Sequence, residues 1–214
     1  MDVGPRTSDF GQCFGLTGGV ACGKTTVARY FQELGARIID ADRIGHELLA
    51  PGLPTAQEVL RTFGEEILGP DGRIDRKKLG NRVFSDPEQL RLLNAIVHPQ
   101  LIARLHELAA EELRLNCQTV VIIDAALIFE WGLDKSLAKV IAAWCRPEQQ
   151  LERLVAKTGM PRTQAEQRIR AQMPAEEKRR RADFVIDCSG TLEQSRAQVG
   201  SIYTELLGTV DKAL

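Results

Sequence analysis

The sequence has few cysteines, few aromatic residues and no long apolar run. Its five cysteines are widely separated and odd in number, without a C-x-x-C pair, so neither a disulfide framework nor a zinc site is expected. No apolar run approaches the roughly 18 residues that span a bilayer, and the polar start lacks the plan of a signal peptide. We therefore expect a cytoplasmic protein without membrane contact, with residues 1–11 as a flexible tail.

Net charge is also nearly absent, but the charges are unevenly distributed. The formal net charge is −1, which gives no indication of a nucleic-acid partner. Residues 146–181 contain ten Lys or Arg and five Asp or Glu, so this segment is net +5 and the remainder is net −6. Such a segment indicates an anionic ligand such as a polyphosphate, or else a solvated helix face.

The composition and the order of apolar patterns indicate one α/β domain over residues 12–214. A content of 43% hydrophobic and 27% charged residues is typical of a soluble globular protein. Five short apolar runs alternate with helical patterns, which predicts a five-stranded parallel sheet between layers of helices. The expected strands are residues 13–17, 36–40, 119–123, 140–144 and 184–186.

Two long helical stretches interrupt this alternation. Between the second and third expected strands, residues 45–116 show turn signals but no clear strand, so we expect a helical insertion that binds the substrate. Within it, Pro99 is expected to kink or interrupt a helical pattern. Residues 146–181 are also helical and highly charged, with Pro161 and Pro174 as breaks, and are expected to form a lid.

A phosphate-binding motif follows the first expected strand. The pattern G-x-x-x-x-G-K-[ST] lies between strand and helix, where backbone N–H groups and the helix N-terminus can surround phosphates. Lys24 can place its charge on the β- and γ-phosphates during transfer, and the Thr25 hydroxyl can bind Mg²⁺. We therefore expect an ATP site; a chance glycine-rich turn is the alternative. The residues expected to contact ATP are Gly18, Gly19, Val20, Ala21, Cys22, Gly23, Lys24, Thr25 and Thr26.

Three carboxylates follow expected strands and therefore border the ligand crevice of a parallel sheet. Asp42 is the candidate base that orients an acceptor hydroxyl and receives its proton. Asp40 can hold Mg²⁺ through water or cap the next helix, and Asp124 ends an apolar strand as a Walker-B acid does, or else is a turn residue. His98, before Pro99, is expected to be packed or to face the substrate.

Several blocks of the sequence resemble dephospho-CoA kinases over about residues 13–205. The blocks occur in the same order along the chain as in that family. They are Leu16–Gly19, Ile39–Asp42, Phe63-Gly64, Asp71–Arg76, Asn94–Pro99, Arg168–Pro174 and Ala182–Asp187.

The resemblance implies a P-loop kinase fold and transfer of the ATP γ-phosphate to the ribose 3′-hydroxyl of dephospho-CoA. Asp42 matches the catalytic base of the family, and the insertion matches its CoA-binding region. The lid would bring Arg153, Lys157, Arg168 and Arg170 to the phosphates and exclude water on closing. Dephospho-CoA and ATP are the only expected partners of a monomer or weak homo-oligomer.

The sequence departs from the family pattern at four positions. Ala126 stands where a proline follows the Walker-B acid, and Lys157 replaces an arginine, so a point charge replaces a bidentate fork. Cys188 replaces an asparagine near the nucleotide base. Cys22 lies close to Lys24 and a helix N-terminus, which predicts either a reactive thiol that ATP protects or an inert loop residue.

Two other functions fit parts of the pattern. A nucleoside monophosphate kinase shares the P-loop, the parallel sheet and the lid, but it surrounds a phosphate acceptor with arginines, whereas Asp42 suits a hydroxyl acceptor. A nucleotide-dependent switch protein needs a residue that positions the hydrolytic water and a partner surface, and the sequence reveals neither. A kinase with an alcohol acceptor is therefore the favoured interpretation.

Overall fold

The computed structural model describes residue 10, residues 12–84 and residues 86–211. Most of the expected tail lies outside these residues, but Phe10 is described and is buried, with its backbone N–H donating to the carbonyl of Ser136 at 3.3 Å. The chain divides into two compact units. We call Met1–Asp40 with Leu108–Leu214 the sheet unit, and Ala41–Glu107 the helical unit.

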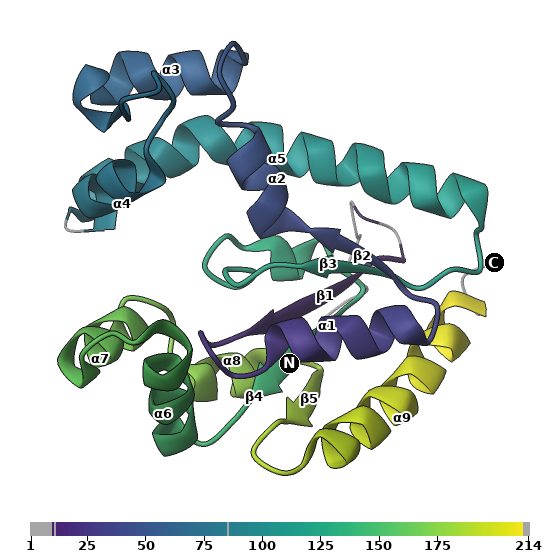
Figure 1. Ribbon diagram of the computed structural model, residues 1–214. Helices are drawn as coiled ribbons and strands as arrows, with labels where there is room; N and C mark the ends of the chain where they lie inside the picture. Colours follow the sequence, from purple (N-terminus) through teal and green to yellow (C-terminus); the bar gives the residue numbers. More distant parts are fainter. Residues whose placement is uncertain (1–9, 11, 85, 212–214) are drawn as a thin grey trace, which may run out of the picture. The chain divides into compact units, whose positions relative to one another are not determined.

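The sheet unit contains the expected five-stranded parallel sheet (Figure 1). Its strands run in the order β2-β3-β1-β4-β5, and each begins and ends within two residues of its expected bounds. Because β1 is central, the residues that follow it leave from the middle of the carboxyl edge. The strands are β1 (Phe14–Gly18), β2 (Arg37–Asp40), β3 (Val121–Asp124), β4 (Lys139–Trp144) and β5 (Phe184–Asp187).

Both faces of the sheet are buried, which explains why its central strands are apolar runs without alternation. Phe14 and Leu16 of β1 belong to a core cluster that includes residues of the first and last helices of the unit. On the opposite face, a Cβ added at Gly15 would meet Ile128 and Leu137 side chains at 2.8 Å. The five residues of β1 are therefore enclosed on both sides.

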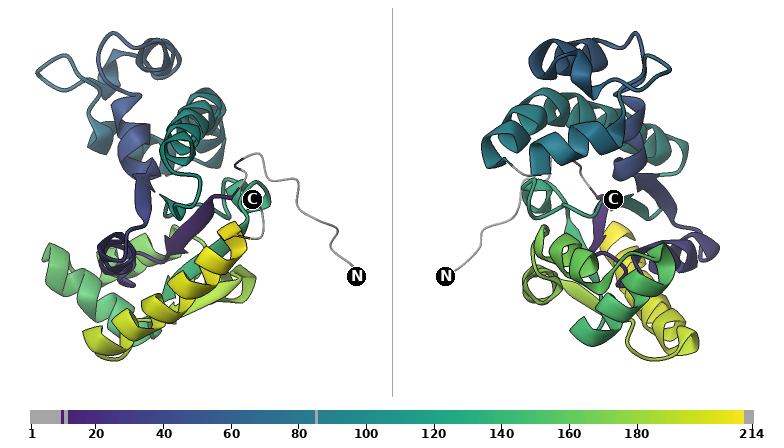
Figure 2. Two further views of the ribbon diagram at one scale, coloured as in Figure 1. Left: turned by 90° about the vertical axis from the view of Figure 1, so that its right-hand side faces the viewer. Right: turned by 60° about the vertical axis from the view of Figure 1, so that its left-hand side comes forward.

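Helices of the sheet unit cover this sheet and extend beyond it. The helices α1 (Lys24–Glu33) and α9 (Leu192–Asp211) pack side by side, and α8 (Ala175–Arg181) packs against β4 and β1 (Figure 1). The helices α6 (Pro147–Thr158) and α7 (Arg162–Arg170) pack against each other (Figure 2). The expected breaks are confirmed, because Pro161 and Pro174 directly precede α7 and α8.

The helical unit contains α2 (Ala41–Glu47), α3 (Pro54–Phe63), α4 (Arg76–Phe84) and most of α5 (Pro87–Leu115), with a short 3₁₀ helix at Glu65–Ile67. As expected, the described part of this unit has no strand; one isolated bridge joins Leu68 and Ile74. Its core is a separate cluster of apolar side chains. These are Val59, Phe63, Ile67, Leu79 and Val83.

The expected interruption of the helix at Pro99 is wrong, because α5 continues through this residue to Leu115; a kink at Pro99 stays a prediction. A proline removes one backbone hydrogen bond, which a helix of this length can lose if packing stabilises the segment beyond. That packing is present: Leu101, Leu105 and Ala109 recur at intervals of four residues and are buried. Among the described residues, no helix is long and apolar enough to cross a membrane.

Candidate active site at the carboxyl edge of the sheet

The phosphate-binding motif forms the turn between β1 and α1. Gly23 precedes α1 at φ 100°, and as a glycine it makes no side-chain cap hydrogen bond at the start of this helix. Ala21 takes φ 60°, the only positive φ at a non-glycine residue in the described ranges. The backbone N–H of Cys22 donates to the carbonyl of Gly19 at 3.1 Å, which closes the turn. Such a turn presents successive backbone N–H groups to an anion.

Gly18 and Gly19 are required for space rather than for backbone conformation. A Cβ at Gly18 would lie 2.6 Å from the backbone oxygen of Ala143, and one at Gly19 would lie 2.6 Å from Nε2 of Gln150. Gln150, on α6, donates from that nitrogen to the carbonyl of Val20 at 2.9 Å. The buried side-chain amide of Gln150 on α6 therefore supports the loop, a contact that the sequence did not reveal.

Lys24 and Asp124 form a short ion pair beside this loop. The distance from Lys24 Nζ to Asp124 Oδ1 is 2.5 Å, and the side chains are only 17% and 11% exposed. Asp124 is paired in register with Leu16 of β1 and with Asp40 of β2, so both expected strand-end acids lie at the same edge of the sheet. The charge of Lys24 is thus held at the mouth of the loop by a carboxylate.

All three of the expected metal-binding side chains belong to the sheet unit. Thr25 is exposed in the first turn of α1, while Asp40 and Asp124 end adjacent strands. A hydroxyl and two carboxylates are oxygen donors of the kind that Mg²⁺ takes, usually together with waters and substrate phosphates. In the described part of the chain, no three His, Cys, Asp or Glu side chains are grouped to hold a metal ion without such additional ligands.

Asp42 and His98 belong to the helical unit. Asp40 ends the first of the two segments of the sheet unit, and Asp42 follows two residues later in the first turn of α2. The two acids thus lie at one of the two points where the chain passes from one unit to the other. His98 lies within α5, where burial lowers the pKa of its imidazole. His98 is half-buried, and its expected role as a packed or substrate-facing residue stays a prediction.

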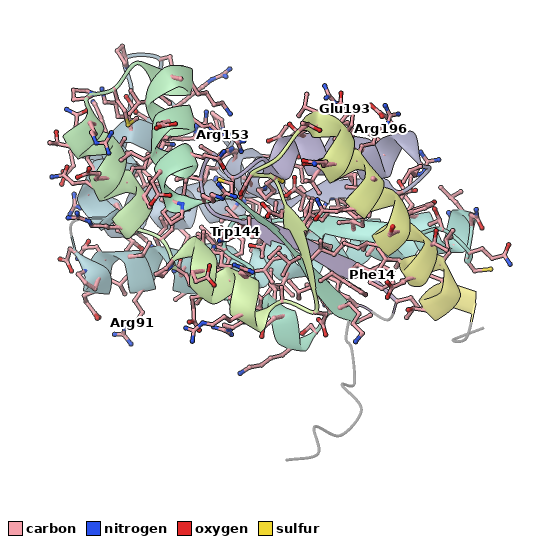
Figure 3. The ribbon with its side chains drawn as sticks, turned by 90° about the horizontal axis from the view of Figure 1, so that it is seen from below. Phe14, Arg91, Trp144, Arg153, Glu193 and Arg196 are labelled. Atoms are coloured by element: carbon pink, nitrogen blue, oxygen red, sulfur yellow. The ribbon has the colours of Figure 1, made fainter. Side chains whose placement is uncertain are left out.

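The expected lid residues occupy different positions on α6 and α7. Arg153 donates from Nη2 to the backbone carbonyl of Cys188 at 2.9 Å, which directs its guanidinium to the loop after β5 (Figure 3). Lys157 is exposed in the last turn of α6, and Arg168 and Arg170 are exposed on α7. Of these four residues, only Arg153 is anchored near the loop after β5; the other three are exposed to solvent.

The thiol of Cys22 is not activated by its neighbours, contrary to one expectation. Cys22 is fully buried, and a hydrogen bond with Cys145, together with burial, raises the pKa of its thiol. Its side chain belongs to the core cluster that also contains Cys145. Cys188 belongs to the same cluster, and burial raises its pKa to about 11. Both residues therefore pack beneath the phosphate loop as small apolar side chains.

A model of the dephospho-CoA kinase family matches residues 12–194 of this chain. The chain is 46% identical over 188 residues to a dephospho-CoA kinase of Carboxydothermus hydrogenoformans, which covers 88% of this chain and 91% of that protein. It is 42% identical over 194 residues to a dephospho-CoA kinase of Symbiobacterium thermophilum, covering 91% and 81% respectively. The similarity therefore includes both units.

Solved structures agree with this similarity. The protein TT1252 from Thermus thermophilus superposes with a TM-score of 0.77 at 34% identity, covering 91% of this chain and 97% of that one. A dephospho-CoA kinase from Campylobacter jejuni superposes with a TM-score of 0.58 at 26% identity, covering 92% and 98%. The sequence and structural comparisons therefore select the same family.

Proposed function

The chain belongs to the dephospho-CoA kinase family, and on this premise we propose that it uses ATP to phosphorylate the ribose 3′-hydroxyl of dephospho-CoA, the final step of coenzyme A synthesis. The observation that carries the proposal is the Lys24–Asp124 pair at the phosphate loop, with Asp40 in register beside it. These groups lie where the carboxyl edge of a parallel sheet binds its ligand. Asp42 lies two residues after Asp40 on the chain.

ATP is bound by its phosphates in this proposal. Backbone N–H groups of the loop and the N-terminus of α1 surround the β-phosphate, and Lys24 neutralises charge on the β- and γ-phosphate oxygens. Asp124 keeps the ammonium at the mouth of the loop before the nucleotide arrives, so less side-chain order is lost on binding. Arg153, fixed by the Cys188 carbonyl, adds a positive charge beside the loop after β5.

Asp42 is the proposed base. The ribose hydroxyl loses its proton to the carboxylate as its oxygen attacks the γ-phosphorus, and ADP leaves with the bridging oxygen. A carboxylate is suited to a hydroxyl acceptor, whereas it would repel the anionic acceptor of a nucleoside monophosphate kinase. The relatives from Carboxydothermus hydrogenoformans, Symbiobacterium thermophilum and Campylobacter jejuni are named as dephospho-CoA kinases.

Mg²⁺ fits the available oxygen donors. Thr25, Asp40 and Asp124 are the residues that would hold the ion or its waters, and the ion would neutralise charge on the transferring phosphoryl group. The helical unit, including His98, would bind dephospho-CoA, while Lys157, Arg168 and Arg170 would approach the phosphates from the lid. Cytoplasmic location and a monomer or weak homo-oligomer remain predictions.

The acceptor tests this function most directly. We would measure ADP release from MgATP with dephospho-CoA, a set of nucleoside monophosphates and small alcohols, and locate the new phosphate by ³¹P NMR. The proposal predicts that dephospho-CoA is preferred and that the phosphate appears as a 3′-monoester. Preference for a nucleoside monophosphate, or a phosphate at another position, would contradict it.

A further inference from the structure

Lys178 of α8 is a lysine buried inside the sheet unit. Its residue exposure is 0%, and it is the only basic residue among the buried residues in the described part of the chain. Removing an ammonium group from water costs several kcal/mol unless it is paired and hydrogen-bonded. Its neighbours on α8, such as Arg180, are exposed as charged helix residues usually are. The buried position therefore requires an explanation specific to Lys178.

The ammonium of Lys178 contacts the segment that follows β3. Its Nζ lies 2.8 Å from Oε1 of Glu130 and donates a short hydrogen bond to the backbone carbonyl of Ala126. That carbonyl also accepts a hydrogen bond from Oγ1 of Thr17 at 3.0 Å. One backbone oxygen is thus held by α8 and by β1 together.

This carbonyl lies two residues after Asp124, the carboxylate that contacts Lys24 at 2.5 Å. Between them, the backbone N–H of Ala125 donates to the carbonyl of Leu16 at 3.0 Å. Ala126 stands where the family pattern has a proline, which would restrict the backbone. The path of this loop therefore depends on the hydrogen bonds of Ala125 and Ala126. Holding Ala126 therefore limits where Asp124 can place its carboxylate.

Glu130 also contacts the residues between α7 and α8, which belong to the expected lid. The backbone N–H of Met173, which lies between α7 and α8, donates to Oε1 of Glu130 at 3.1 Å. The same carboxylate therefore binds Lys178 and the chain that leaves α7. All of these residues belong to the sheet unit.

We propose that Lys178 is a positioning residue for phosphoryl transfer: it fixes the loop that carries Asp124 and, through Glu130, connects that loop to the end of the lid. A purely structural role makes a different prediction: removing one partner of a buried ion pair leaves Glu130 without its counter-charge and lowers stability, but the protein that folds keeps parental turnover. A positioning role predicts lost turnover in a folded protein. The inference rests on the proposed kinase reaction.

The test uses Lys178→Met, with Arg180→Met as the matched control on the same helix. Arg180 is exposed and forms an ion pair with Glu177, three residues away on the same helix. We expect Lys178→Met to lower kcat for dephospho-CoA by roughly 10- to 100-fold, because small displacements of reacting groups have effects of this size. The Kd of MgATP should change less than about threefold, and the control should match the parent.

A double-mutant cycle with Asp124→Asn tests whether Lys178 acts through Asp124. In the Asp124→Asn background, Lys178→Met should lower kcat by less than about threefold further, since the group it positions is already lost. If the double variant loses kcat by the product of the two single-variant factors, the proposal is overturned. A parental kcat in Lys178→Met would also overturn it. Urea unfolding of each variant establishes that the rates come from folded protein.

Thr17→Val provides a second route if Lys178→Met does not fold. It removes the other donor to the Ala126 carbonyl while nearly conserving the volume of the side chain. We expect a smaller loss of kcat, about 3- to 10-fold, again non-multiplicative with Asp124→Asn. A parental kcat in this variant would overturn the proposal. A parent enzyme that does not phosphorylate dephospho-CoA would instead refute the proposed function, and this inference with it.

Discussion

Replacing Gly23 by alanine tests the geometry of the phosphate loop. Gly23 precedes α1 at φ 100°, a conformation that costs an L-residue about 1–2 kcal/mol. The added Cβ would also lie 3.2 Å from Sγ and 3.3 Å from Cβ of Cys188, closer than ordinary van der Waals contact. We expect Gly23→Ala to lower the free energy of unfolding of the sheet unit by about 2 kcal/mol in total.

Urea unfolding followed by tryptophan fluorescence measures this change, because Trp131 and Trp144 both lie in the sheet unit. Gly200→Ala on α9 is the control: its added Cβ meets no atom within 4 Å, so stabilisation by about 0.5–1 kcal/mol is expected. In a Cys188→Ala background, which removes the contact with Sγ but keeps the one with Cβ at 3.3 Å, the Gly23→Ala penalty should fall but stay above about 1 kcal/mol, the backbone part. Parental stability of Gly23→Ala would refute the strained turn, and a penalty abolished by Cys188→Ala would refute the backbone contribution.

Three further predictions concern reactivity, acid stability and the second core. A thiol reagent under native conditions should label the exposed Cys117 and leave the four buried cysteines unmodified, with and without MgATP; labelling of Cys22 that MgATP prevents would contradict its buried position. Backbone N–H groups of Lys78 and Lys77 lower the pKa of Asp75. The Asp75 carboxylate therefore stabilises the fold at pH values above its pKa in the unfolded state. This stabilisation is lost as the pH falls through the lower pKa that Asp75 has in the folded state. Asp75→Asn should lose less stability than the parent from about pH 5 to pH 2 in acid titrations by circular dichroism, and equal losses would contradict this. Val59→Ala should destabilise the helical unit by about 2 kcal/mol in urea, whereas Leu92→Ala, partly exposed, should cost under about 0.5 kcal/mol; equal costs would contradict the assigned core.

The strands and the phosphate loop could be predicted because local sequence determines them. Apolar runs buried on both faces leave a continuous signal, and the motif from Gly18 to Thr25 requires a strand before it and a helix after it. The continuation of α5 through Pro99 could not be predicted in this way. It depends on the packing of Leu101 and Leu105, which compensates for one lost hydrogen bond.

Contacts between distant segments were also beyond the sequence. Gln150 supports the loop at Val20 across 130 residues, and Lys178 reaches Ala126 across 52. In sequence, both are ordinary polar residues on charged helices. The reactive-thiol hypothesis for Cys22 failed for the same reason, because proximity to Lys24 along the chain did not reveal that the side chain points into the core.

In the proposed reaction, a loop of backbone amides with Lys24 holds the triphosphate while Asp42 accepts the proton of the attacking hydroxyl. Single-turnover phosphoryl transfer by Asp42→Asn, with saturating MgATP and dephospho-CoA, measures the role of this carboxylate when the Kd of MgATP is titrated in parallel. We expect a parental Kd and a transfer rate lower by about 10²- to 10⁴-fold, the usual contribution of a general base. An undiminished transfer rate, or a rate loss explained entirely by weaker MgATP binding, would show that Asp42 is not the base.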